Sequence, residues 1–318
     1  MNSIGINLEK LCKQATREVL LVAPFIKQVA LQRLLAIIPK GVTLRCITRW
    51  KPEEIASGVT DLEIWHLIKD YPNSSLELRS DLHAKYYRVD EQCLIGSANL
   101  TNKGLGWSTS SNLELLVELS AETEELKNFE EELLRGCIQV DQNLFNQVAK
   151  TVALLKEQFP QSNQLTDEGN KVKLFLNFDN TFSNYWLPTL RNPGCLYLAY
   201  SEQWEKLTIS TQEAANQDLM AFPLPNNLSE DTFNSYMGIL ILQKSIVQEV
   251  DNFVKTPQRF GAVKNLILSL NKNKSENFNA TRCWQTLMRW LLYFLPNRYA
   301  TSVPNYSEIF YRIDYYDE

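Results

Sequence analysis

Apolar and polar residues follow two different periods along the first 157 residues. Runs typical of buried or half-buried strands occur at Val19–Ala23, Thr43–Thr48, Ser75–Arg79, His83–Val89, Gln92–Gly96 and Leu113–Leu119. Apolar residues recur at helical spacing over Leu8–Arg17, Val29–Ile38, Leu62–Ile68 and Glu122–Arg135. Strands that alternate with amphipathic helices predict an α/β domain, in which a mixed β-sheet is flanked by helices.

A polar connector separates this part from a second domain. Residues 158–171 contain Pro160, Gly169 and several Asn, Gln and Ser residues, which is typical of an exposed linker. We therefore expect one domain at 1–157 and another at 172–318. In the second, strands are predicted at Lys171–Phe178, Cys195–Tyr200 and Leu207–Ser210, and helices at Phe233–Phe253, Phe260–Leu270 and Thr281–Leu295. This mixture predicts an α+β domain, and target recognition is one role it would suit.

Charge and cysteine content narrow the setting of the protein. The 318 residues carry a net charge of −5, so a polyanion would have to be held by a local basic patch. The six cysteines include no C-x-x-C pair, so neither a zinc site nor a compact disulfide framework is predicted. The N-terminus lacks the order of a secretory signal, and no apolar run is long enough to span a bilayer. These features predict a cytoplasmic protein without a membrane partner.

The first candidate reactive residues are His83 and Lys85. On a strand, residues i and i+2 point to the same face about 7 Å apart, so these two side chains are expected to project together. An imidazole beside an ammonium group forms a site for an anion. The cation would stabilise charge on phosphoryl oxygens while the neutral imidazole attacks phosphorus.

Three further residues are expected to face the same anion. The next predicted strand ends in Gly96-Ser97, where glycine permits a close backbone approach and the side chains of Ser97 and Asn99 can donate to a phosphate. Glu114, on the following predicted strand, is expected to accept a hydrogen bond from His83 and so fix the tautomer of its imidazole. The set thus predicts a nucleophile, an orienting carboxylate and a clamp for the oxyanion.

These residues together resemble the HKD motif of the phospholipase D superfamily. The matching string is His83-x-Lys85-x-x-x-x-Asp90, followed by Gly96-Ser97-x-Asn99 and a later Glu114. Leu21–Phe25, Ile47–Trp50 and Asp61–Glu63 are also similar to the first strand, second strand and following helix of the small bacterial nucleases and restriction endonucleases in that superfamily. The resemblance spans roughly residues 15–120 and implies a phospholipase D-like fold without a metal or other cofactor.

One departure from the superfamily pattern concerns the number of motifs. Superfamily members use two motifs that face each other, one histidine forming a phosphohistidine and the other protonating the leaving oxygen. This chain has two histidines, and His66 has no lysine two places on. The second catalytic histidine must therefore come from another chain. The resemblance thus implies a homodimer in which both copies of His83 meet at one phosphate, and a two-fold axis supplies that geometry.

Several charged residues allow two interpretations. Asp90, at a strand end before Glu91, is expected to be structural like Gly96 rather than catalytic. Arg49 and Lys103 are candidate phosphate ligands. A surface position is the equal alternative for Arg49 and the favoured one for Lys103. In the second domain, a basic face is one interpretation of six residues and a scattered solvated surface is the other; they are Lys264, Lys272, Lys274, Arg282, Arg289 and Arg298. Trp204, Trp284, Trp290 and Tyr299 are either base-stacking or core residues.

The residues and the resemblance together predict a metal-independent phosphodiesterase. Its expected substrate is DNA rather than RNA, cut by a dimeric endonuclease through a phosphohistidine. A phage-defence setting is suggested by analogy alone. The alternatives are a phospholipid phosphodiesterase or phosphatidyl transferase with the same half-sites, and an assembly protein whose motif binds phosphate without turnover.

Overall fold

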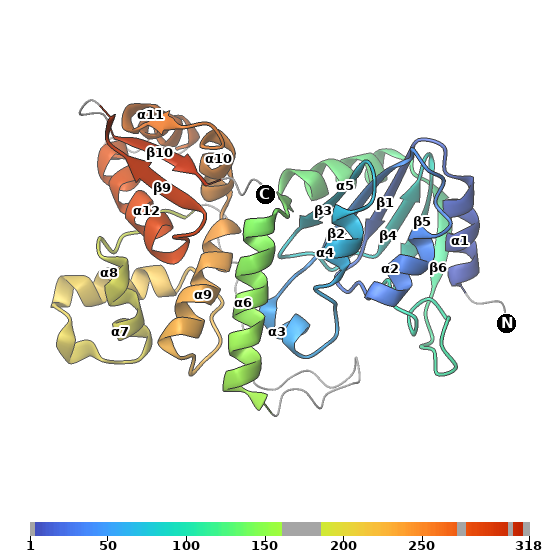
Figure 1. Ribbon diagram of the computed structural model, residues 1–318, viewed down its shortest axis with the longest axis horizontal. Helices are drawn as coiled ribbons and strands as arrows, with labels where there is room; N and C mark the ends of the chain where they lie inside the picture. The colour runs from blue at the N-terminus through green and yellow to red at the C-terminus, as the bar shows by residue number, and fades with distance from the viewer. Residues whose placement is uncertain (1–3, 161–185, 272–277, 305–307, 314–318) are drawn as a thin grey trace. The chain divides into compact units, whose positions relative to one another are not determined.

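The computed structural model describes residues 4–160, 186–271, 278–304 and 308–313 (Figure 1). The chain forms two compact units, and the first includes residues 4–141. Helix α6, Gln142–Gln158, belongs to the second unit, because Gln147 and Thr151 on it bond to Ser235 of helix α9, Glu230–Leu242. This division differs from the expected domain limit at residue 157.

A mixed seven-stranded sheet forms the centre of the first unit. Its strands lie in the order β6 (Leu116–Ser120), β5 (Gln92–Gly96), β4 (Tyr86–Val89), β1 (Glu18–Val22), β2 (Thr43–Thr48), β3 (Ser74–Leu78) and β7 (Ile138–Gln139). β1, β2 and β3 are parallel, whereas β4 pairs antiparallel with β1, and β5 and β6 continue antiparallel. The predicted mixed sheet is confirmed.

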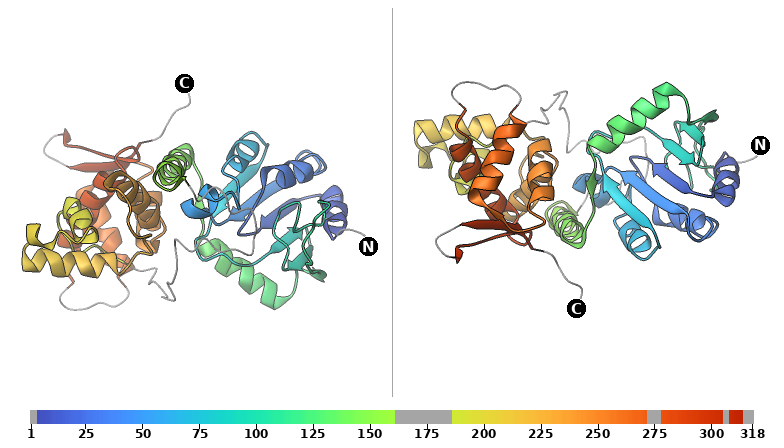
Figure 2. Two further views of the ribbon diagram at one scale, coloured as in Figure 1. Left: turned by 90° about the horizontal axis from the view of Figure 1, so that it is seen from below. Right: turned by 90° about the horizontal axis from the view of Figure 1, so that it is seen from above.

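Helices cover both faces of this sheet (Figure 2). They are α1 (Gly5–Gln14), α2 (Gln28–Leu35), α3 (Pro52–Ala56), α4 (Ile64–Lys69) and α5 (Glu124–Arg135). Under α5, Leu20 and Val22 of β1 form a buried core with Leu133 of the helix. Tyr86 of β4 meets Phe129 of α5 edge to face, with ring centroids 5.4 Å apart. The alternate apolar residues of β1 thus fix which face of the sheet receives the helix.

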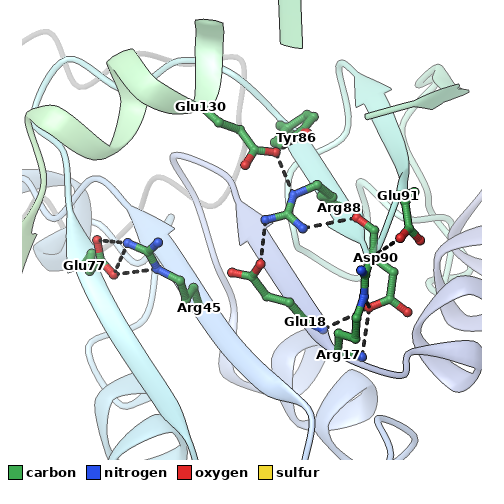
Figure 3. A network of polar contacts seen from close by, with 9 residues as sticks. All are labelled: Arg17, Glu18, Arg45, Glu77, Tyr86, Arg88, Asp90, Glu91 and Glu130. Atoms are coloured by element: carbon green, nitrogen blue, oxygen red, sulfur yellow. Dashed lines mark hydrogen bonds and ion pairs between the residues drawn. The ribbon is translucent and has the colours of Figure 1, made fainter. Parts of the chain in front are cut away.

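A polar network joins α5 to two central strands (Figure 3). Arg88 of β4 donates to Glu130 of α5 over 2.7 Å and to Glu18 of β1 over 2.9 Å. Tyr86 donates to the same Glu130 carboxylate. Because Arg88 is mostly buried, these charge-assisted bonds satisfy a cation that would otherwise be costly to bury. Polar contacts thus add to the apolar packing in fixing the position of α5 on the sheet.

The second unit is mainly helical, with a small sheet. Its further helices are α7 (Leu196–Tyr200), α8 (Ile209–Leu219), α10 (Ser245–Phe253), α11 (Phe260–Leu270) and α12 (Ala280–Phe294), and its short 3-10 helices are Pro193–Cys195 and Trp204–Lys206. The sheet has the order β8 (Gln258–Arg259), β10 (Ile309–Arg312), β9 (Tyr299–Ser302). The α+β class is confirmed, with strands in other places than expected.

Three predictions for the second unit were wrong. Cys195–Tyr200 forms mostly helix, not a strand, because its aromatic and apolar residues pack at helical spacing beneath α9. Leu207–Ser210 contains the start of α8, where the Thr208 side chain accepts a hydrogen bond from Thr211 N–H and caps the helix. The single helix expected at Phe233–Phe253 is two helices, divided before Ser245. The strand expected at Lys171–Phe178 lies outside the described residues.

Candidate active site

The sheet register brings the predicted site residues to one edge. Val22 at the end of β1 pairs with Tyr86 at the start of β4, and Gly96 at the end of β5 pairs with Leu116 at the start of β6. Segments that leave β1, β2 and β5 therefore meet segments that enter β4 and β6. The residues carried there are Phe25, Arg49, His83, Lys85, Ser97, Asn99 and Glu114. The edge gathers what the sequence separates by up to 89 positions (114 − 25).

His83 and Lys85 lie in the segment just before β4, not on the strand that was predicted to begin at His83. The His83 side chain is exposed, and the Lys85 ammonium donates to the His83 carbonyl oxygen over 2.8 Å. The nearby Lys85 charge, with partial burial and Arg49, lowers the pKa of the His83 imidazole below its usual range. A neutral imidazole is the form that can attack phosphorus.

An NMR titration can test this electrostatic arrangement. In a His66→Gln protein, His83 is the single remaining imidazole, so its titration can be followed without overlap. We expect the pKa of His83 to lie below 6.5, and Lys85→Gln to raise it, because the lysine charge disfavours imidazolium. The acid limb of any activity that needs neutral His83 should then also lie below pH 6.5. An unchanged pKa in Lys85→Gln, with Lys13→Gln as the control, would contradict the arrangement.

Glu114 pairs with Ser97 instead of His83. The Ser97 hydroxyl donates to one carboxylate oxygen of Glu114, and the Asn112 amide donates to the other over 3.3 Å. Glu114 precedes β6, which begins at Leu116 and not at Leu113 as predicted. The Glu114–His83 bond that was expected does not form, and the carboxylate instead orients the hydroxyl of Ser97.

Gly96 is required by the neighbouring strand. A Cβ at position 96 would lie 1.9 Å from the carbonyl oxygen of Leu115, well inside van der Waals contact. The Ser97 N–H donates to that same carbonyl over 3.0 Å, and the Leu115 N–H donates back to the Ser97 hydroxyl over 3.1 Å. The close backbone approach expected at Gly96 thus involves β6. It draws Glu114 toward Ser97.

Asn99 lies beside the end of β1. Its side-chain oxygen accepts a hydrogen bond from the Phe25 N–H over 3.4 Å, and Lys27 N–H donates to the Leu100 carbonyl over 3.0 Å. Tyr87, buried on β4, donates its hydroxyl to the Ala98 carbonyl over 2.7 Å. These bonds hold the segment that follows β5 against the segment after β1 and against β4.

Arg49 has partners other than the predicted phosphate. Its guanidinium donates to Glu54 of α3 and to the Leu82 carbonyl over 3.0 Å, and it lies 5.4 Å from the Phe25 ring centroid. Burial raises the pKa of Glu54, while the arginine opposes that rise. The pair thereby holds the residue that precedes His83. Glu54 was not among the residues predicted from the sequence, although Pro52 at the first helical position is a start signal for α3.

Asp90 lies in the turn between β4 and β5 and holds the start of β1 (Figure 3). Its carboxylate accepts hydrogen bonds from the N–H groups of Thr16, Arg17 and Glu18 over 2.8–2.9 Å. Burial alone would raise the pKa of Asp90, but these bonds outweigh it and lower the pKa to about 2. Its backbone has a φ of 51°, which Asp tolerates in turns. These contacts are structural.

Lys103 lies in the turn that follows Thr101. Its carbonyl accepts hydrogen bonds from Asn112 N–H over 3.1 Å and Gly106 N–H over 3.4 Å. Phosphate binding by this lysine stays a prediction. Across the residues that the structure describes, no cluster of three His, Cys, Asp or Glu side chains is arranged to hold a metal ion. The same residues include no helix long and apolar enough to cross a membrane.

The first unit matches a known protein family. Residues 8–135 match the family model described as "Cardiolipin synthase, PLD-like domain", a range that contains every site residue above. The first unit is a phospholipase D-like domain. It therefore belongs to the phospholipase D superfamily, as the motif predicted. A search of curated proteins found no match.

Solved structures similar to the phospholipase D-like domain include nucleases and a lipid enzyme. NucT from Helicobacter pylori and Nuc, a phospholipase D family member from Salmonella typhimurium, each share 16% identity, with 43% of this chain and 91% of theirs covered and TM-scores of 0.35. Phosphatidylserine synthase from Haemophilus influenzae shares 16% identity, with 48% of this chain and 41% of that chain covered and a TM-score of 0.33.

Proposed function

We propose that the protein is a metal-independent DNA endonuclease whose active site is shared by two copies of the chain. The observation that carries the proposal is the exposed His83 with the Lys85 ammonium beside it, at the sheet edge that also holds Ser97, Asn99 and Glu114. Lys85 and Asn99 would hold the phosphoryl oxygens. Ser97, oriented by Glu114, would hold the same group.

The reaction would proceed in two displacements at phosphorus. An imidazole nitrogen of one His83 attacks the phosphorus atom, and the bond from phosphorus to the leaving oxygen breaks. The partner's His83, protonated, gives its proton to that oxygen. Water then attacks the phosphohistidine, losing a proton to the partner's His83, and the phosphorus–nitrogen bond breaks. Each histidine ends as it began, so no external oxidant, reductant or metal is consumed.

An apolar row on β6 supports the proposed dimer. Leu113, Leu115, Val117 and Leu119 are 40–102% exposed and alternate along this edge strand and its approach. An uncovered edge strand with exposed apolar residues is a surface that proteins ordinarily pair or cover. The row flanks Glu114, so a second copy that covered it would lie beside the site. This fits the need for a second His83.

A phospholipid phosphodiesterase or phosphatidyl transferase is the second candidate. Two observations favour it: the description of the matched family, and the exposed Leu113 and Leu115 on either side of Glu114. DNA is preferred because the motif is similar to that of the small bacterial nucleases of the superfamily, and because a second unit could select target sites. By analogy with phage-defence nucleases, the same proposal includes a role in phage defence.

Cleavage in EDTA tests the proposed function. Purified protein would be incubated with supercoiled plasmid, labelled RNA and labelled phosphatidylcholine, each with EDTA and with added Mg²⁺. We expect nicked or linear plasmid in EDTA at a rate that Mg²⁺ does not raise more than about twofold, because the residues supply the charge that a metal would. Turnover of the lipid alone would support the second candidate. Phosphate binding without turnover of any substrate would support an assembly protein.

A further inference from the structure

Residues 245–312 follow the order helix, strand, helix, helix, strand, strand. These elements are α10, β8, α11, α12, β9 and β10. β10 lies between β8 and β9 and is antiparallel to both. Two helices followed by two strands, of which the last is central, have the order of elements of a winged helix-turn-helix unit; residues 272–277, in the link between α11 and α12, lie outside the described residues. In this topology α11 and α12 are the paired helices, and α12 holds the position of the recognition helix.

The inner face of α12 is committed to the core of this unit. Trp284 meets Phe310 of β10 edge to face at 5.1 Å, and the Trp290 indole N–H donates to the Leu190 carbonyl over 2.8 Å. Trp284, Trp290 and Tyr299 are at most 2% exposed, so base stacking by these three, one of the two sequence interpretations, is wrong. What α12 presents to a partner must be its other face.

That outer face is basic and polar. Arg282, Gln285 and Arg289 are exposed at helical spacing i, i+3 and i+7, so they lie along one side over about 10 Å of helix. Arg191 lies beside these residues, because the preceding residue, Leu190, accepts a hydrogen bond from Trp290 of α12. Together they line a cavity of ≈ 610 Å³ with Asn279 and Thr281, and no carboxylate of the described residues lines it.

The basic face is smaller than the sequence suggested, and it is differently composed. Arg298 is not part of it, because its guanidinium is buried and donates to Asp251 over 2.7 and 2.8 Å. Lys272 and Lys274 lie outside the described residues. Arg282 and Arg289 are the members of the predicted cluster that line the cavity, and Arg191 was missed because it is 91 positions (282 − 191) from Arg282.

We propose that this winged helix-turn-helix unit binds double-stranded DNA, with the outer face of α12 in the major groove. The choice of nucleic acid as partner rests on the proposed nuclease function. Arginine pairs bidentately with guanine and glutamine with adenine in that groove, so Arg282, Gln285 and Arg289 can read bases. Arg191, beside the helix, is placed to contact a phosphate. The unit would thus select the sites that the phospholipase D-like domain cuts.

Binding by a full-length His83→Ala protein tests the proposal without cleavage of the probe. The probe is a fluorescein-labelled pool of random 30-base-pair duplexes, and anisotropy is measured at several salt concentrations. Arg282→Ala/Arg289→Ala is expected to weaken binding at least tenfold. It should also lower the slope of log K against log salt by roughly 0.9 for each phosphate that these arginines neutralise. The control, Lys13→Ala/Arg135→Ala, removes two exposed positive charges from helices of the first unit and should bind like the parent.

Selection of bound duplexes from the random pool distinguishes recognition of bases from attraction by charge alone. Duplexes retained by the parent from the random pool are expected to share a motif, and Arg282→Lys/Arg289→Lys, which keeps both charges, should lose that motif because lysine lacks the bidentate fork. Equal affinity in the parent and in a folded Arg282→Ala/Arg289→Ala protein would overturn the proposal, as would a tenfold preference for single-stranded RNA. Plasmid cleavage by the wild-type protein is scored separately. Loss of duplex binding in the arginine variants supports the proposal even if no substrate is cleaved.

Discussion

The His83→Ala protein is expected to lose at least about 10³-fold of its phosphodiester cleavage rate. The substitution removes the attacking nitrogen and, in a shared site, the proton donor for the leaving oxygen, and each of these is worth orders of magnitude. Because His83 is exposed and its side chain is not part of a core cluster, the fold should be unaffected. Initial rates on supercoiled plasmid in EDTA would be measured, with circular dichroism to check the fold.

The matched control for this prediction is His66→Ala. His66 is the other histidine of the chain, exposed on α4, and it lies outside the sheet edge that carries the site. Its removal should leave the cleavage rate within about twofold of wild type, because isolated surface substitutions have small effects. Full activity in His83→Ala, or an equal loss in both variants, would contradict the assignment of the nucleophile.

Mixed dimers show whether two copies of His83 serve one phosphate. If wild-type and His83→Ala chains are unfolded together in equal amounts and refolded, about one quarter of the dimers contain two intact histidines. We therefore expect about one quarter of the wild-type activity. Independent sites in each chain would leave about one half. A monomeric enzyme with full activity, seen by light scattering, would contradict the shared site directly.

The Asp251→Ala protein is expected to lose about 3–5 kcal/mol from the stability of its second unit. Asp251 of α10 is buried and accepts hydrogen bonds from Arg298, from the Tyr299 hydroxyl over 2.6 Å, and from Arg312 over 3.1 Å. Removing the carboxylate takes away the two charge-assisted bonds that Asp251 accepts from Arg298, whose side chain is 3% exposed. Because the partners come from β9, β10 and the turn after α12, the whole winged unit should loosen.

Urea unfolding followed by tryptophan fluorescence would measure this loss, because Trp284 lies in the same unit. The control Glu213→Ala, an exposed carboxylate on α8, should change stability by less than about 0.5 kcal/mol. A change below about 1 kcal/mol in Asp251→Ala would contradict the role given to this carboxylate.

The same carboxylate predicts a dependence of stability on pH. Burial opposes ionisation of Asp251, but the bonds from Arg298 and Tyr299 outweigh it and lower its pKa below the usual 3.8. A lowered pKa in the folded state means that the contribution is complete above pH 3.8 and is lost as pH falls through the folded pKa. The difference between wild type and Asp251→Ala should therefore narrow below pH 3.8.

Much of the local structure was determined by the sequence alone. β2 at Thr43–Thr48, β5 at Gln92–Gly96 and α11 at Phe260–Leu270 were predicted to the residue, because apolar periodicity there agrees with the turn residues at the ends. The HKD-like residues were also found, since their spacing along the chain is itself the signal.

Other features were decided by tertiary packing. Cys195–Tyr200 has residues that suit a strand, yet it is mostly helical because its apolar side chains pack against α9. The local pattern also predicted a hydrogen bond between Glu114 and His83. In the structure Glu114 accepts a hydrogen bond from Ser97 instead, because the chain entering β6 lies close to Gly96. Such choices depend on strand register and on which buried faces meet, and neither is written in a short stretch of sequence.

The sequence by itself thus determined the candidate catalytic residues and the α/β class of the first unit, because both are carried by spacing along the chain. Only the tertiary structure showed that Arg49, paired with Glu54, donates to the carbonyl of the residue before His83. Only the tertiary structure brought Arg191, Arg282 and Arg289 together at one cavity beside α12. These groups are distant in sequence and are joined by sheet register and helix packing. Contacts of that kind are set by the fold as a whole, since each needs several buried interfaces to form together.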